Sequence, residues 1–388
     1  MANKPIKIAL LGLGTVGTGV YKLLSMRADD MPQIAGAPIE ISHILVRNAS
    51  KPRSGVETAL LTDNWNDIIS DPEVSIVVEL MGGIEPAHTY IKEALQANKN
   101  VVTANKDLIA VHGGELLDLA EEHHCDLQFE ASVAGAIPII HPLKQSLAGN
   151  RITEIMGIVN GTTNYILTRM TEDGMELSEA LAKATELGYA EADPTADIEG
   201  YDAGRKVAIM ASIAFHSRVT FDDVFTEGIT NIQARDIRYA KEMGKAVKLL
   251  GVACNTDEGI EVRVHPMLIP SSHPLATDTA RNILMHCTGR IGCTCYKKLP
   301  IKKMEDIKSK YYLRLEVENR MGVLAGVTGV LGNNGVSISQ VLQKASDTDS
   351  AELVVITDTV RERHMRDALT ILSNMSMVHK IASVIRVY

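Results

Sequence analysis

Residues 6–26 read IKIALLGLGTVGTGVYKLLSM, and this stretch decides the fold of the first part of the chain. A short apolar run over 6–12 has the length of a buried strand, and a helical pattern follows over 16–26. The turn between them carries the pattern G-x-G-x-x-G, formed by Gly12, Gly14 and Gly17. These glycines permit a tight turn, a close approach of the backbone to a pyrophosphate, and packing of the helix on the strand. An ordinary glycine-rich turn is the alternative, but the order of strand, turn and helix favours dinucleotide binding.

The residues that follow continue this alternation of strands and helices. Four further apolar segments predict strands, at 39–46, 75–80, 100–104 and 126–132. Helical patterns lie between them, near 85–97 and 107–123. Strands that alternate with helices are joined by crossover connections and form a parallel sheet. The sequence therefore predicts an α/β fold, with a Rossmann-type NAD(P)-binding domain over residues 1–138.

The rest of the chain predicts two further domains. Over 139–288, longer helical patterns are mixed with strand-like segments, which is typical of an α+β domain. A basic stretch within 289–310, KKLPIKKMEDIKSK, predicts an exposed linker, because a run of charges is usually solvated. Residues 311–388 show the order βαββαβ, which predicts a compact ferredoxin-like unit.

Bulk composition narrows the classes of partner. The chain has 388 residues and a formal net charge of -9, whereas a nucleic-acid binder needs a concentrated basic face. No apolar run reaches the length of a membrane span. The N-terminal residues lack the pattern of a signal peptide, and the five cysteines are an odd number. These features predict a cytoplasmic protein with reduced thiols that binds neither nucleic acid nor membrane.

The end of the second predicted strand bears on the choice of nucleotide. An acid there would hold the 2′-hydroxyl of NAD, but the chain reads VRNASKPR, with Arg47, Lys51 and Arg53. Cations pair with a 2′-phosphate, so NADP is favoured over NAD; a basic surface loop is the alternative. Lys106 follows the strand at 100–104, where ligands of open parallel sheets bind, although a solvated loop lysine explains it equally well.

The stretch GYAEADPTADIEGYDAGRK, residues 188–206, crowds five carboxylates next to an apolar helical pattern. Asp202 and Lys206 are neighbours one helical turn apart, and the same face continues with Ile209 and Ile213. This apolar continuation favours a buried pair over an exposed salt bridge, and a buried lysine beside a carboxylate is a candidate acid–base group. The other acids are suited to hold a substrate ammonium. A metal site is the alternative, but the cluster lacks EF-hand spacing.

Three cysteines gather in CTGRIGCTC, residues 287–295. A zinc site usually needs a second pair of cysteines or histidines at a set spacing, and the chain shows none after this cluster. Free thiols in a loop are therefore the preferred interpretation.

At this point the chain resembles homoserine dehydrogenase with a C-terminal ACT domain, of the long bacterial type. The motifs that carry the resemblance are GLGTVG, ELMGG, VVTANKDLIA, FEASVAG, VNGTTNYIL and LGYAEADPTADIEGYDAGRKVAIMAS. The similarity extends over residues 1–276 and again over about 280–388. The resemblance implies an enzyme that interconverts L-homoserine and L-aspartate 4-semialdehyde with NAD(P), on the route to threonine, isoleucine and methionine.

The resemblance also implies roles for residues of the motifs. Lys206 is the expected acid–base group, and Lys106 is its expected partner between cofactor and substrate. The expected substrate ligands are Glu191, Asp202, Asp197, Tyr189 and the amides of Gly161 and Thr162. The expected cofactor contacts are Gly12, Gly14, Thr15, Val16, Gly17, Arg47, Lys106 and Gly188. The family also binds a sodium ion, and its expected ligands here are Glu130 and the carbonyls of Val133, Gly135 and Ile137.

The last domain resembles an ACT domain, which implies a bound small amino acid and pairing across subunits. NRMGVLA, residues 319–325, matches the strand-to-helix ligand turn of that family. The expected effector contacts are Asn319, Gly322, Val323 and Leu324. L-Threonine is the expected effector, and a homodimer or homotetramer is the expected assembly.

One departure from the family concerns the residues after Ala276. The family continues there for several tens of residues that carry a sheet strand, a glycine-rich turn at the cofactor and the start of a helix, whereas TDTARNI follows at once here. Such a deletion is expected to leave sheet-edge groups unpaired and apolar surface exposed. The alternative to a working enzyme is therefore a non-catalytic, amino-acid-sensing ACT protein.

Overall fold

The computed structural model describes residues 4–135, 137–276, 282–289, 299–345 and 350–388. The chain divides into two compact units. The first contains Met1–Leu147 and Arg218–Phe221, and the second contains Ala148–Ser217 and Asp222–Tyr388. Within the described residues, every helix is too short or too polar to cross a bilayer.

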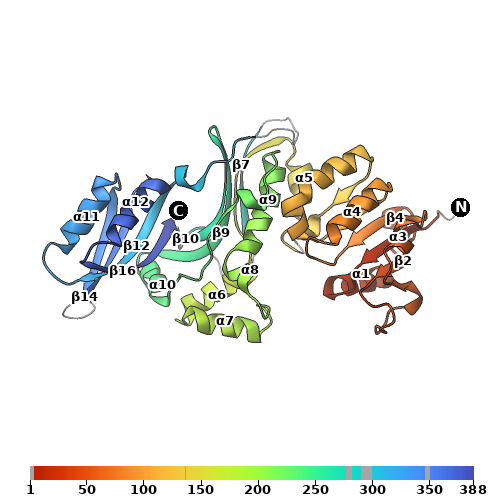
Figure 1. Cartoon of the computed structure of the whole chain (residues 1–388), viewed down its shortest axis with the longest axis horizontal. Helices are drawn as coiled ribbons and strands as arrows, with labels where there is room; N and C mark the ends of the chain where they lie inside the picture. Colours follow the sequence, from red (N-terminus) through yellow and green to blue (C-terminus); the bar gives the residue numbers. More distant parts are fainter. Residues whose placement is uncertain (1–3, 136, 277–281, 290–298, 346–349) are drawn as a thin grey trace. The chain divides into compact units, whose positions relative to one another are not determined.

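The first unit is built on a six-stranded parallel sheet (Figure 1). Its strands are β1 (Ile6–Leu11), β2 (Ile39–Leu45), β3 (Leu61–Thr62), β4 (Val74–Glu79), β5 (Asn100–Thr103) and β6 (Leu127–Gln128). Its helices are α1 (Thr15–Met26), α2 (Met31–Ala35), α3 (Asn66–Ile69), α4 (Ala87–Gln96) and α5 (Lys106–Glu122). The strand order β3-β2-β1-β4-β5-β6 is that of a doubly wound dinucleotide-binding sheet, which confirms the predicted Rossmann-type fold.

The core of this sheet explains why these segments are strands. Leu10, Leu11, Ile44 and Val77 are fully buried, as expected for a parallel sheet covered on both faces. The strand predicted over 126–132 is shorter than expected, because Glu130–Ser132 turns into a 3-10 helix.

The second unit carries one long sheet with the order β11-β7-β9-β10-β16-β12-β14-β13. Its strands are β7 (Asn150–Ile158), β8 (Phe225–Thr226), β9 (Lys245–Thr256), β10 (Gly259–Pro270), β11 (Asn282–Gly289), β12 (Lys308–Glu318), β13 (Ile338–Ala345), β14 (Ser350–Thr357), β15 (Val360–Arg361) and β16 (Val378–Val387). Its helices are α6 (Gly161–Glu172), α7 (Leu177–Glu186), α8 (Thr195–Ile198), α9 (Tyr201–Ala214), α10 (Ala234–Glu242), α11 (Val323–Asn333) and α12 (Glu362–Leu372). The two units together also contain short 3-10 and π-helical turns, at Thr58–Leu60, Glu130–Ser132, Pro142–Ser146, Phe221–Asp223 and Met304–Asp306.

The C-terminal part of this unit has the predicted ferredoxin-like order. Its strands lie as β16-β12-β14-β13, and α11 and α12 pack on one face of them (Figure 1). It is joined to the preceding strands through backbone pairing, since β16 runs parallel to β10 at Met267–Arg386 and Leu268–Val387. The ACT-like sheet and the middle of the chain thus form one continuous sheet.

The stretch that the sequence predicted as an exposed linker is partly built into this sheet. The amide of Ile260 donates to the carbonyl of Pro300 at 2.8 Å, and the amide of Lys302 donates back to the carbonyl of Ile260 at 2.8 Å. Ile307 is only 2% exposed. The prediction of exposure is therefore wrong for half-buried Lys302 and for Ile307, whereas Pro300, Lys303 and Lys308 are exposed as predicted.

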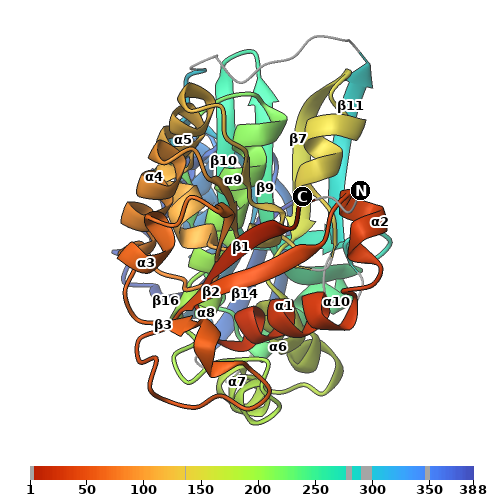
Figure 2. The same ribbon diagram turned by 90° about the vertical axis from the view of Figure 1, so that its right-hand side faces the viewer.

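The sheet edge at β7 also differs from the prediction. A deletion after Ala276 was expected to leave edge groups unpaired, but β11 pairs antiparallel with β7 along Asn150–Ile158 (Figure 2). Over Glu154–Gly157 the backbone of β7 is therefore paired on both sides, by β11 and by β9, and β11 becomes the edge strand of the sheet. The three cysteines of the predicted thiol loop belong to β11 or lie outside the described residues.

Candidate active site

The glycine-rich turn after β1 is held by tight backbone packing. Gly12 has a φ of 101°, which favours glycine, and its amide donates to the carbonyl of Leu45 at 2.9 Å. A Cβ added to Gly17 would lie 2.2 Å from the carbonyl oxygen of Gly12, whereas a Cβ on Gly14 would meet no atom within 4 Å. The turn is thus packed on its inner side and open at Gly14, Thr15 and Val16, which are exposed. This open side lies at the N-terminus of α1, where a phosphate is favoured.

A buried acid organises the carboxyl ends of the neighbouring strands. Glu79 is fully buried, and its carboxylate accepts hydrogen bonds from the amides of Met81 at 2.7 Å and Gly82 at 3.2 Å, and from the Thr103 hydroxyl at 2.6 Å. The ELMGG motif therefore ends β4 in a fixed turn next to β5. Sequence reasoning quoted this motif but gave Glu79 no role.

Lys106 is the first residue of α5, and Asn105 holds it there. The Asn105 side chain caps the helix by accepting from the amide of Leu108 at 3.1 Å, and it donates to the carbonyl of Gly83 at 2.6 Å. Lys106 is half-buried at the end of β5, where the topology placed it. The asparagine before Lys106 is a helix-cap signal that sequence reasoning missed.

The cations of the basic loop after β2 differ in their contacts. The guanidinium of Arg53 donates to the carbonyls of Asn48 and Lys51 at 3.3 Å, so it closes the loop on itself. Arg47 and Lys51 are exposed. Of the three cations, these two are the ones available to a phosphate.

In the second unit, α9 carries the predicted buried pair. The Lys206 ammonium donates to the Asp202 carboxylate at 2.5 Å and to the carbonyl of Val159 at 3.0 Å. The side chains of Lys206 and Asp202 are 15% and 9% exposed, and Ile209 and Ile213 continue the same face into the core. This confirms the expectation that Asp202 and Lys206 are not an exposed surface pair.

Asn160 links this pair to a second acid, and sequence reasoning missed it. It is 4% exposed, and its amide nitrogen donates to Asp202 at 2.9 Å and to Asp197 at 2.6 Å. Its carbonyl oxygen caps α6 by accepting from the amide and the hydroxyl of Thr163, both at 2.8 Å. Because every polar atom of the amide is used, its orientation is fixed, and it separates two carboxylates that would otherwise repel.

The loop between α7 and α9 brings the other predicted substrate ligands near the start of α6. Gly188 ends α7 with a φ of 76°, and the Thr162 hydroxyl donates to the carbonyl of Tyr189 at 2.8 Å. The ring of Tyr189 stacks on Tyr165 with 4.5 Å between centroids. Gly161 is the first residue of α6, so backbone amides of that helix end lie beside this loop.

The remaining acids of the loop, Glu191 and Asp193, are both exposed. Glu191 is exposed, so its carboxylate is accessible from solvent. The carboxylate of Asp193 accepts from the amide of Thr195 at 3.1 Å, and hydrogen bonds from Thr195 hold the pKa of Asp193 below its usual value. Asp193 therefore stabilises the start of α8, a structural role that the sequence did not predict.

The turn predicted to bind sodium is organised by Glu130. Its carboxylate accepts from the amides of Ile139 at 2.6 Å, Ile140 at 2.9 Å and His141 at 2.7 Å. A carboxylate offers about four lone-pair positions, so these three bonds leave capacity for one further partner. The chain reverses at Ala134, which has a φ of 50°.

The ligand turn of the ACT-like unit has the predicted strand-to-helix form. Gly322 precedes α11 with a φ of 88°, which favours glycine. Val323 packs in the core, whereas Asn319 and Leu324 are exposed. The predicted contact residues therefore flank the N-terminus of α11, with Val323 serving the core.

Three family models match the chain. They are described as "Homoserine dehydrogenase, NAD binding domain" over residues 12–130, "Homoserine dehydrogenase" over 138–298, and "ACT domain" over 311–375. The homoserine dehydrogenase of Corynebacterium glutamicum is 42% identical, over 98% of this chain and 95% of that protein. The homoserine dehydrogenase of Bacillus subtilis is 38% identical, over 99% and 98%.

Solved structures give the same likeness. A homoserine dehydrogenase from Thiobacillus denitrificans has a TM-score of 0.92 at 36% identity and covers 99% of this chain and 98% of its own. The Staphylococcus aureus homoserine dehydrogenase at pH 6.0 has a TM-score of 0.77 at 33% identity, with 100% and 99% covered.

The alignments also bear on the missing residues. The alignment with the Corynebacterium protein has 424 columns, which is 36 more than the 388 residues of this chain. At least 36 residues of that relative therefore have no counterpart here. This agrees with a shortened chain.

Proposed function

The chain belongs to the homoserine dehydrogenase family, an NAD(P)-dependent oxidoreductase family, and we propose that Lys206 carries the proton of its reaction. The observation that carries this proposal is the pair on α9, with the Lys206 ammonium held by Asp202 at 2.5 Å and by the carbonyl of Val159 at 3.0 Å. These two acceptors fix the amine in a nearly buried place. A fixed amine with a carboxylate neighbour is suited to general acid–base work.

The reaction interconverts L-homoserine and L-aspartate 4-semialdehyde. In the oxidation, a bound nicotinamide would accept the hydride from the carbinol carbon as its C–H bond breaks. The hydroxyl proton passes to the amine of Lys206, and the C–O bond becomes the carbonyl. In the reduction, the ammonium of Lys206 returns this proton as the hydride is delivered. Lys106, at the end of β5, is the proposed assisting cation.

We propose that the acids around Asn160 receive the amino group of the substrate. Asp202 and Asp197 both accept hydrogen bonds from Asn160, so they are presented together, and exposed Glu191 is the third acid. The amides of Gly161 and Thr162 at the start of α6 would receive the substrate carboxylate, since a helix N-terminus favours an anion. Tyr189 and Gly188 border this place.

The cofactor is proposed to lie on the open side of the glycine-rich turn. The proposed contacts are Gly12, Gly14, Thr15, Val16, Gly17, Arg47, Lys106 and Gly188. When bound, it supplies and accepts the hydride. The exposed cations Arg47 and Lys51 support a preference for NADP over NAD, because they are available to the 2′-phosphate.

A sodium ion is proposed at the Glu130 turn. The donor set fits such an ion, because hard cations favour oxygen ligands and Glu130 keeps capacity for one more partner beside its three amides. Val133, Gly135 and Ile137 would contribute carbonyls. The ion would stabilise this turn and take no part in the hydride or proton steps.

The proposed domains are a nucleotide-binding domain over residues 1–138, a catalytic domain over 139–288, a linker over 289–310 and a regulatory ACT domain over 311–388. In the last, L-threonine is the proposed effector, bound near Asn319, Gly322, Val323 and Leu324. A homodimer or homotetramer is proposed, with ACT units paired across subunits. A cytoplasmic location is proposed as well, and it is supported by the free thiols of Cys125 and Cys254.

Two assays test these proposals. Absorbance at 340 nm is followed with the purified chain, L-homoserine and NADP; steady reduction of the cofactor is expected. Binding of threonine without any turnover would instead identify an amino-acid-sensing protein that has lost the reaction. Titration of the activity with L-threonine is expected to lower the rate, and a flat response up to millimolar threonine would contradict the regulatory proposal.

A further inference from the structure

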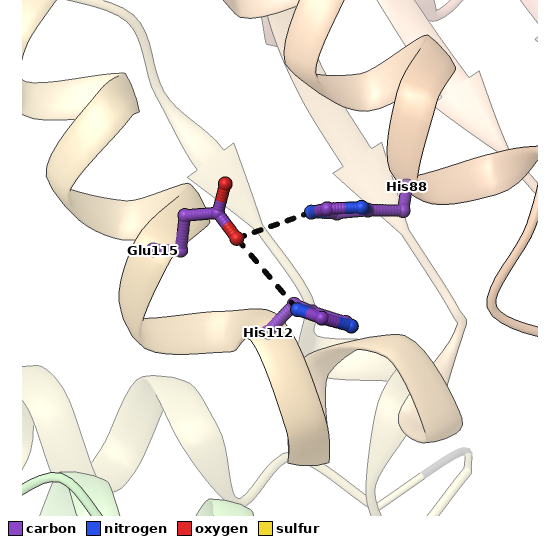
Figure 3. Close-up of side chains that lie close together, drawn as sticks. All are labelled: His88, His112 and Glu115. Atoms are coloured by element: carbon purple, nitrogen blue, oxygen red, sulfur yellow. Dashed lines mark hydrogen bonds and ion pairs between the residues drawn. The ribbon is translucent and has the colours of Figure 1, made fainter.

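Two histidines and a glutamate of the first unit converge between α4 and α5 (Figure 3). Nε2 of His88, on α4, lies 3.2 Å from Oε2 of Glu115, on α5. Nδ1 of His112, one helical turn before Glu115, lies 3.6 Å from the same oxygen. One ligand atom from each of the three side chains lies within 4.8 Å of the others. The cluster takes no part in the reaction described above.

The second ring nitrogen of His88 has its own acidic partner. Nδ1 lies 3.3 Å from Oε1 of Glu85, whose other oxygen accepts from the Thr89 hydroxyl at 2.9 Å. With a proton on Nδ1 donated to Glu85, Nε2 can offer its lone pair to an ion that lies between it and Glu115. A carboxylate that orients a histidine in this way is the usual outer partner of a metal-bound imidazole.

Glu115 is held as a carboxylate with one oxygen directed at the rings. Its Oε1 accepts from the Lys92 ammonium at 2.7 Å, which leaves Oε2 for the rings. Oε2 faces both histidines, whose rings are stacked with 4.2 Å between centroids. One nitrogen of each imidazole thus lies near the same carboxylate oxygen.

We propose that this cluster binds one divalent transition-metal ion, with zinc preferred, through Nε2 of His88, Nδ1 of His112 and Oε2 of Glu115. Bond lengths of about 2.0–2.2 Å in a tetrahedral site put ligand atoms roughly 3.3–3.5 Å apart. The separations of 3.2 and 3.6 Å from Oε2 agree with this spacing. Nitrogen ligands favour zinc, nickel or copper over magnesium or calcium.

The proposed ion would join two helices by bonds from both. His88 lies in the first turn of α4, while His112 and Glu115 lie in the middle of α5, so the ion would cross-link them. The rings are stacked and inclined by only 21°, and the lone pair of each nitrogen lies in its ring plane, so at least one ring must turn about its side-chain bonds for both nitrogens to bind the ion. Since α5 begins at Lys106, the ion would stabilise the helix that presents this lysine. It would act on the stability of the unit and not on the reaction.

The test measures zinc binding to the full-length, untagged chain with its thiols alkylated, by calorimetric titration with ZnCl2 and by the melting temperature. One equivalent of zinc with a micromolar or tighter Kd, and a rise in melting temperature, are expected. His88→Asn and His112→Asn are each expected to weaken binding by about 100-fold. His124→Asn is the matched control, because this exposed histidine lies outside the cluster, and it should bind like the parent.

Cobalt provides a second readout that does not depend on stability. Visible absorption bands of a bound Co²⁺ ion are expected in the parent and in His124→Asn, and not in His88→Asn or His112→Asn. Absence of binding to the parent chain would overturn the proposal. So would one equivalent of zinc retained with unchanged affinity in both cluster variants, because the ion would then bind elsewhere.

Discussion

Replacing Arg314 by methionine tests how the ACT-like sheet is attached to the rest of its unit. Nε of Arg314 donates to Asp236 at 2.6 Å, and its terminal nitrogens donate to Gln233 at 2.7 Å and to Glu352 at 3.1 Å. Arg314 and Asp236 are fully buried, and Glu352 is 4% exposed. Asp236 and Gln233 belong to the start of α10, whereas Arg314 lies on β12. One guanidinium therefore bonds the middle of the chain to the ACT-like sheet.

The expected loss of free energy of unfolding follows from the buried carboxylates that Arg314→Met leaves in place. Without Arg314, the fully buried Asp236 keeps hydrogen bonds from Tyr312 and from the amide of Gln233 but loses its cation, whereas Glu352 keeps Arg235 and Tyr239. Removing the cation of a buried pair in this way lowers the free energy of unfolding by about 3–5 kcal/mol. With a urea slope of about 2 kcal/mol per molar, the midpoint of unfolding falls by roughly 1.5–2.5 M. Far-UV circular dichroism follows the loss of structure. Trp65 is the single tryptophan and lies in the first unit, so its fluorescence reports that unit separately.

Arg320→Met is the matched control. Arg320 also lies in the ACT-like part and pairs with Glu318, but its side chain is 57% exposed. Exposed pairs contribute about 0–1 kcal/mol, so its midpoint should shift by at most about 0.5 M. Equal shifts for Arg314→Met and Arg320→Met would refute the reasoning that the buried cluster holds the two parts together.

Three further predictions concern single residues. Asn160→Ser keeps an oxygen to cap α6 but loses the amide donors to two carboxylates; hydrogen bonds to charged groups contribute about 1.5–3 kcal/mol, so kcat/KM for homoserine should fall roughly 10- to 100-fold, and the melting temperature should fall as well because both carboxylates lose a buried donor. Burial holds the pKa of His265 well below its usual value, so below about pH 6.5 the unfolded chain binds a proton that the folded chain does not, and stability is lost as the pH falls. Between about pH 6.5 and pH 5, the urea midpoint of His265→Gln should therefore fall less than the midpoint of the parent chain. Gly17→Ala puts a methyl group 2.2 Å from the Gly12 carbonyl oxygen and should abolish NADPH binding in a fluorescence titration, whereas Gly19→Ala, whose methyl group meets no atom within 4 Å, should bind normally.

Local patterns explain why much of the fold was predicted from the sequence. The strand, turn and helix over 6–26 and the order βαββαβ over 311–388 depend on periodicity and turn residues, which neighbouring residues determine. Short elements such as α3 and β3 carry too few residues to show a period, so they were missed. The basic stretch before β12 looked solvated, but Lys302 pairs with Glu258 and Glu261, which only the folded chain brings near it.

In the candidate site, too, local sequence patterns predict some residues and miss those that only the fold brings together. Asp202 and Lys206 were predicted because they are four residues apart on one helix, so the pair and its apolar continuation are visible in the sequence. Asn160 was missed because its bond to Asp202 spans 42 residues of chain, and no local pattern records it. Its position just before α6 was the available signal, since asparagine is a preferred helix cap. That signal predicts a cap, but not the two carboxylates that it bridges.

The turnover of Lys206→Ala is the most direct test of whether Lys206 carries the proton of the reaction. The variant is assayed at 340 nm with L-homoserine and NADP, and its NADPH affinity is measured by fluorescence titration. We expect turnover to fall by at least 100-fold, within the range of general acid–base catalysis, while NADPH affinity stays within about twofold of the parent. Lys183→Ala, which removes a partly exposed lysine of α7, should keep full activity. Turnover of Lys206→Ala at the rate of the parent chain would show that Lys206 does not carry the proton.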